Sequence, residues 1–200
     1  MPTVIDRLRF EHRNLERLVR LLGRQPSLLA SAEAPNIGLL VNTLYYLTRF
    51  PDVTHHPLED RIVERLRDRD ALPAGLAEEI EAQHITLARQ GLDLLRDLEG
   101  ALRQETISPE LVEANIRLYS ERLRHNMAVE ELALFPAAVC QLDDEDWRAI
   151  EHSTPPSEPD PLFETLVETR FAELRQAIAL EAGLAAMPEW RRVAGKEASS

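Results

Sequence analysis

The sequence predicts an all-α protein, arranged as an up-down-up-down four-helix bundle with an additional C-terminal helix. Glycine is scarce, with 7 in 200 residues, whereas Leu, Ala, Glu and Arg are common. Strictly alternating runs of β-branched residues are missing, and the apolar residues recur at helical spacing. Four long helical segments with three connections favour a bundle in which successive helices are antiparallel.

The first helix is predicted over residues 3–22, with Thr3 as its N-cap. Its apolar stripe consists of Leu8, Leu15, Val19 and Leu22. Gly23 is expected to stop this helix, and a loop that contains two prolines follows as far as Pro35.

The second helix is predicted over residues 36–69, and it contains Pro51 and Pro57. A proline inside a helix removes a main-chain hydrogen bond and clashes with the preceding turn. We therefore expect a break near residues 50–54 and a second segment that starts close to His55.

The third helix is predicted over residues 73–102, with Ile80, Leu87, Leu94 and Leu98 on one face. The fourth opens at Ser108 with a proline in its first turn, and it runs to about Leu134. A further short helix is expected over residues 143–150.

The composition changes after the fourth helix. Residues 1–150 are predicted to form the bundle, and residues 151–161, which are rich in proline, to form a linker. Residues 162–200 are predicted to hold a fifth amphipathic helix, from Phe163 to about Leu184, and a disordered tail.

Charge and cysteine content exclude several classes of function. The formal net charge of -12 argues against a nucleic-acid-binding protein and against attraction to an anionic membrane. A membrane span needs about 20 apolar residues, and the longest apolar run, residues 132–140, is shorter and contains Pro136. Cys140 is the single cysteine, which excludes an internal disulfide and a thiolate metal site. With no apolar leader at the N-terminus, we expect a cytoplasmic protein.

The histidines are the residues that point to chemistry. Five of the 6 lie in the four predicted bundle helices, and each helix carries at least one. His12 and His84 fall on the apolar stripes of their helices, while His55 and Glu59 stand at i and i+4 and can bind one metal ion side by side. A single buried histidine is usually a core residue with a hydrogen-bond partner. Four helices that each send one inward need a common cation.

The fourth helix leaves its contribution open. His125 and Glu130 are five residues apart, so an ideal helix aims Asn126 and Glu130 at the core and places His125 aside. A π-bulge near Asn126 could bring His125 and Glu130 together. In a second alternative, Glu130 is a long bridging ligand and His125 binds from the side of the helix. In a third, Asn126 replaces a lost ligand and the metal site is impaired. His56 is expected to be exposed or to support a ligand.

Two motifs make the chain resemble the hemerythrin-like domains, also called HHE cation-binding domains. The motifs are HHPLED, which begins at His55, and HNMAVEELALFP, which begins at His125. The resemblance covers about residues 1–150, and it implies a four-helix bundle that holds a non-haem di-iron centre with two bridging carboxylates. The positions that match the ligands of the family are His12, His55, Glu59, His84, His125 and Glu130.

The chain departs from the family pattern at two places. Oxygen-carrying members have a second histidine one turn from the position of His84, where this chain has Ile80 and Ala88. One ion would therefore keep a water or take a nearby carboxylate such as Glu81. Many bacterial members have histidine four residues before the last glutamate, where this chain has Asn126, although the five-residue spacing resembles that of the oxygen carriers.

The resemblance implies a di-iron protein that binds or senses O2, NO or a related oxidant, with manganese or zinc as compatible metals. A histidine-rich site with only two carboxylates favours reversible binding of a small diatomic ligand over enzymatic oxidation, by analogy with the family. A second hypothesis is an iron-handling or NO- and peroxide-detoxifying repair factor. A third is an interaction module with a degenerate metal site. The C-terminal helix is a candidate contact for a homodimer.

Overall fold

The computed structural model describes residues 3–24, 35–105, 107–153, 160–163 and 168–185. Within these ranges the regular structure is entirely helical, without a strand, which confirms the all-α prediction. No helix among the described residues combines the length and the apolar character that a membrane span requires.

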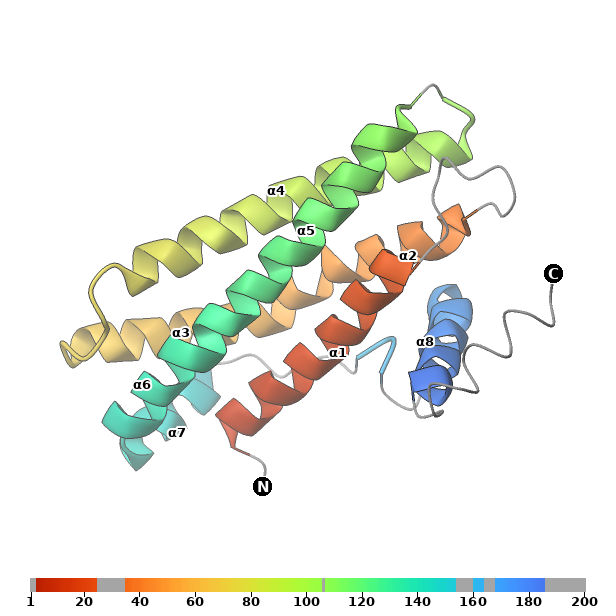
Figure 1. Ribbon diagram of the computed structural model, residues 1–200. Coiled ribbons are helices and arrows are strands. Elements are labelled where there is room, and N and C mark those ends of the chain that lie inside the picture. The colour runs from red at the N-terminus through yellow and green to blue at the C-terminus, as the bar shows by residue number, and fades with distance from the viewer. Residues whose placement is uncertain (1–2, 25–34, 106, 154–159, 164–167, 186–200) are drawn as a thin grey trace. The chain divides into compact units, whose positions relative to one another are not determined.

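Four long rods form the bundle within the first compact unit, Met1–Pro159. The rods are α1 (Val4–Arg24), α2 (Ile37–Leu47) continued by α3 (His56–Asp68), α4 (Leu76–Leu102) and α5 (Pro109–Val129). Each rod runs antiparallel to the next one along the chain, as predicted (Figure 1). Asn36 and Ser108 cap α2 and α5 by accepting hydrogen bonds from main-chain N–H groups.

The second rod departs from a regular α-helix where the prolines predict a break. A π-helical segment, Pro51–His55, separates α2 from α3. The N–H of His56 donates to the carbonyl of Pro51, five residues back, and Pro57, the next residue, has no N–H to donate. The wider π turn therefore accommodates the missing hydrogen bond without ending the rod.

The fourth rod accommodates a proline in the same way. A second π-helical segment, Glu130–Leu134, follows α5, and the N–H of Phe135 donates to the carbonyl of Glu130 immediately before Pro136. The rod continues as α6 (Phe135–Gln141). The π segment thus begins at Glu130 and leaves the preceding helix, with Asn126 on its inner face, regular.

The expected short helix is α7 (Asp144–Ser153), which packs against α3. Arg69, just past the end of α3, bridges Asp143 and Asp146 and ties α7 to the bundle. A cluster of buried apolar side chains, including Leu8, Ile62 and Ile80, fills the end of the bundle at which α1 begins.

The second compact unit, Asp160–Ser200, contains a short 3-10 turn (Thr169–Phe171) and α8 (Ala172–Ala185). The helix starts later than the predicted Phe163, because the Asp160 carboxylate accepts two main-chain N–H bonds and holds Phe163 in a turn. Most of the predicted linker and the predicted tail lie outside the described residues.

Candidate metal centre

Four buried side chains from three rods meet in the middle of the bundle. They are His12 from α1, His55 and Glu59 from the second rod, and Glu130 from the π segment after α5. One potential ligand atom from each lies within 4.8 Å of every other. The two carboxylates have no exposed surface, which is rare for Glu unless it is paired or bound to a metal.

Hydrogen bonds orient the two histidines of this group so that their Nε2 atoms face each other. The Nε2 atom of His12 lies 3.0 Å from that of His55. On the outer edges, Nδ1 of His12 lies 2.9 Å from a carboxylate oxygen of Glu131, and Nδ1 of His55 lies 2.7 Å from one of Glu11. A carboxylate accepts a hydrogen bond from Nδ1–H, which leaves the Nε2 lone pair of a neutral ring directed inward.

The carboxylates of the group have oxygen atoms without hydrogen-bond partners. Both oxygens of Glu59 and Oε2 of Glu130 are buried and unpartnered. Oε1 of Glu59 lies 3.3 Å from Nε2 of His55, and Oε2 of Glu130 lies 3.2 Å from Nε2 of His12. Nitrogen lone pairs and unpartnered carboxylate oxygens that converge in a dry core need positive charge between them. This donor set fits a metal ion.

A second group of potential ligands shares one of these carboxylates. It consists of His56, Glu59 and His84, again with ligand atoms within 4.8 Å of one another. Nε2 of His84 lies 3.6 Å from Oε2 of Glu59 and 3.2 Å from Oε1 of Glu130. The rings of His56 and His84 stack with centroids 3.9 Å apart. Each of the two glutamates therefore turns one oxygen toward His12 and the other toward His84.

The electrostatics of the cluster favour positive charge at the histidines. Burial disfavours the imidazolium of His12, but contacts with Glu130 and Glu59 outweigh it and raise the pKa of His12 to about 9. Burial also opposes the charge of His55, yet the negative charge of Glu59 and the hydrogen bond with Glu11 raise its pKa to about 10. Burial raises the pKa of Glu59, but the charge of His55 and the contacts with His55 and His12 outweigh burial and lower this pKa below its ordinary value. A proton or a metal ion can supply the charge that the carboxylates require.

Comparison with known proteins agrees with this geometry. The sequence profile of the hemerythrin HHE cation binding domain matches residues 3–138. The chain belongs to this family. No curated protein and no solved structure gives a significant match. The family and the buried histidine–glutamate cluster together indicate a metal-binding helical protein.

The structure of this HHE domain does not bring His125 to the cluster, which corrects the predicted ligand set. The side chain of His125 is 65% exposed, and its Nε2 lies 3.7 Å from Glu79. Because α5 remains a regular helix as far as Val129, it turns Asn126 rather than His125 toward the core. The apolar stripe of α5, which continues to Asn126 and Glu130, was the sequence signal for this orientation.

Asn126 occupies the position where many bacterial HHE domains carry histidine. Its amide Nδ2 donates to Oε1 of Glu130 at 2.6 Å and to Oε1 of Gln83 at 3.1 Å. Asn126 therefore holds the Glu130 carboxylate from the side. One of the alternatives was a π-bulge near Asn126. A π turn exists in this rod, but it begins only at Glu130 and does not reorient His125.

Sequence reasoning did not identify Glu11 at the HHE site, and it left the roles of His56 and Glu131 open. His56 was expected to be exposed or supporting, yet it is half-buried and lies with Glu59 and His84. Glu11 and Glu131 each hold the outer edge of a ligand histidine on another rod. Each is the sequence neighbour of a predicted ligand, which was the one available signal.

Proposed function

We propose that the cluster holds two iron ions and that the domain binds or senses O2, NO or a related oxidant. The observation that carries this proposal is the orientation of the two buried carboxylates. Glu59 and Glu130 each face His12 with one oxygen and His84 with the other. Two bridging carboxylates of this kind suit a pair of cations, because their charges offset the repulsion between the ions.

The residues divide into two sets of ligands around these bridges. His12 and His55 would hold one ion, and His84 and His56 the other. Imidazole and carboxylate ligands suit iron, and also manganese or zinc. When bound here, reduced iron with an open coordination position would bind a diatomic ligand.

The two positions differ in their access to solvent. The side chains of His12 and His55 are 2% and 4% exposed, whereas that of His84 is 11% exposed and His56 is half-buried. The ring of Phe135 stacks on His12, with centroids 5.3 Å apart, and covers that face of the imidazole. A small ligand would reach the centre most readily from the edge formed by His56 and His84, whose side chains are more exposed.

A histidine-rich site with two carboxylates favours reversible binding over oxidation, by family-level analogy. Glu11 and Glu131 fix the orientation of two of the rings that would hold the metal. Stoichiometric uptake of NO without turnover is the behaviour expected of such a binding site.

One observation favours a second candidate, an interaction module with an incomplete metal site. Asn126 takes a ligand position of related domains, and its amide donates a hydrogen bond to Glu130. In that case the chain would keep its fold but hold fewer than two ions.

Anaerobic loading with ferrous iron, followed by removal of unbound metal and elemental analysis, separates these candidates. We expect two irons per chain and a saturable spectral change with NO. Glu59→Gln, which preserves side-chain volume, should lower the iron content below one per chain, and Glu64→Gln, on the exposed face of α3, should leave it unchanged. A folded wild-type chain that retains no iron would contradict the proposal, and catalytic consumption of NO or peroxide would favour the repair enzyme.

A further inference from the structure

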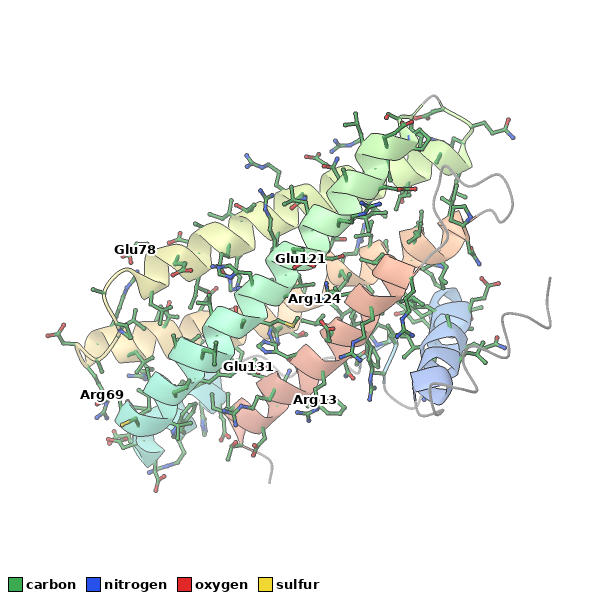
Figure 2. All side chains as sticks on the ribbon, in the orientation of Figure 1. Arg13, Arg69, Glu78, Glu121, Arg124 and Glu131 are labelled. Carbon is green, nitrogen blue, oxygen red and sulfur yellow. The ribbon has the colours of Figure 1, made fainter. Side chains whose placement is uncertain are left out.

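A cavity of about 450 Å³ opens on the surface between α1 and α5, next to the ligand cluster. Four arginines line it: Arg13, Arg17 and Arg20 from α1, and Arg124 from α5. Figure 2 shows Arg124 and Glu131 between these two helices, with Arg13 on α1. This gathering of guanidinium groups stands out in a chain whose formal net charge is -12.

The carboxylates of the cavity neutralise only part of this charge. Glu16 pairs with Arg20 at 2.9 Å and with Arg124 at 3.2 Å. Arg124 also pairs with Glu121 at 3.0 Å. The other lining carboxylate, Glu131, accepts a hydrogen bond from His12.

Arg13 and Arg17 have no carboxylate within ion-pair distance among the residues that the structure describes. The guanidinium of Arg13 lies 5.5 Å from the centroid of the Phe10 ring. Arg17 donates to Oδ1 of Asn14 at 3.3 Å, which is an uncharged partner. Both side chains are exposed, so their positive charge faces the cavity and the solvent.

This combination of charge and size fits one class of ligand. A guanidinium group binds a carboxylate or a phosphate through two parallel hydrogen bonds. The volume lies within the range of about 300–1,000 Å³ that is usual for small-molecule sites, and Met127 adds an apolar surface to the wall. We propose that this cavity binds a small organic anion whose phosphate or carboxylate groups contact Arg13 and Arg17.

The cavity adjoins the metal centre without depending on it. His12 and Glu131 line its inner wall, so a bound anion would lie beside the hydrogen bond that holds the His12 ring. The arginines themselves belong to neither group of potential metal ligands. Anion binding can therefore be tested with the metal-free chain, where phosphate and citrate cannot act by chelating iron.

Isothermal titration calorimetry of the metal-free full chain with inorganic phosphate and with citrate, at low ionic strength, tests the proposal. We expect saturable binding of at least one anion, weakened at least tenfold in the double variant Arg13→Gln, Arg17→Gln. The matched control is Arg96→Gln, Arg117→Gln, which removes the same charge from the exposed surface of α4 and α5. This control should change the dissociation constant less than twofold.

The two probes also distinguish the source of the anion. Tighter binding of phosphate assigns a phosphorylated ligand, and tighter binding of citrate assigns a carboxylate. The proposal is overturned if neither anion binds saturably, or if the two double variants weaken binding equally, since that would reflect net charge alone. Circular dichroism checks that each variant is folded, and iron content, measured separately, reports on the metal centre.

Discussion

His12 and His55 point their Nε2 atoms at each other across 3.0 Å, and each ring is held from behind by a carboxylate of a neighbouring rod. Glu131 holds His12, and Glu11 holds His55. When both rings are neutral, this arrangement directs two nitrogen lone pairs to the place where Glu59 also directs an oxygen without a hydrogen-bond partner. Such a meeting of acceptors is costly in a dry core unless a cation joins them.

Glu11 and Glu131 should therefore increase metal affinity without being ligands themselves. Replacing Glu11 with Gln or Glu131 with Gln weakens the fixed Nδ1–H contact, and such changes typically lower metal affinity about 10–100-fold. Competition with a chelator of known affinity measures this loss. Glu78→Gln, on the exposed face of α4, is the control and should have no effect. Unchanged affinity in both variants would remove the orienting role.

Replacement by alanine should lower the iron content at His56 and leave it unchanged at His125. His56 lies with Glu59 and His84, so its loss should reduce the iron content from two per chain toward one. His125 is 65% exposed, and its loss should leave the iron content unchanged. Elemental analysis of both variants after identical loading is the measurement, and iron loss in His125→Ala would restore the ligand set that the sequence predicted.

Much of the fold follows from local sequence patterns. The apolar stripes place the rods, and Pro57 and Pro136 mark the two π segments because each lacks the N–H that a regular helix needs. The late start of α8 was not predictable from its amphipathic pattern, because the turn at Asp160 depends on side-chain hydrogen bonds to the main chain.

The site was only partly predictable, for a physical reason. His12, His55, Glu59, His84 and Glu130 stand on inward-facing stripes, which the helical period shows. The contact of Glu131 with His12 joins residues 119 positions apart, and that of Glu11 with His55 joins residues 44 apart. No local pattern encodes which rod lies behind a given ring. The resemblance to the family favoured His125, whereas the stripe of its own helix favoured Asn126.

The metal-free and metal-loaded chains should differ in their dependence on pH. The pKa of His12 rises to about 9 and that of His55 to about 10, from an ordinary value of 6.5. The stability that these raised pKa values contribute is present below pH 6.5 and is lost as the pH rises through 9 to 10. The metal-free chain should therefore melt at a lower temperature at pH 9.5 than at pH 6.5.

Metal binding should show the opposite trend, because the ligand nitrogens must lose their protons before they bind. The increase in melting temperature caused by the metal should be larger at pH 9 than at pH 6.5. Differential scanning calorimetry of both forms across this range measures the two trends. A melting temperature of the metal-free chain that rises with pH would contradict the assigned protonation.

Close packing between α4, the end of α2 and α5 depends on Gly91. A Cβ atom at this position would lie 2.6 Å from Cγ2 of Thr48 and 3.2 Å from the ring of Tyr119. We expect Gly91→Ala to destabilise the chain by about 1–3 kcal/mol, because the overpacking outweighs the better helix propensity of alanine. Gly23→Ala, where nothing lies within 4 Å, should be neutral or slightly stabilising in urea denaturation. Equal stability of the two variants would contradict this packing.

The most direct test of the metal centre is an anomalous-difference map at the iron absorption edge, from crystals of the anaerobically loaded chain. We expect two peaks inside the bundle, one beside His12 and His55 and the other beside His84, with Glu59 and Glu130 between them. A map without a peak in the core, from crystals that contain iron only at the surface, would contradict the central claim.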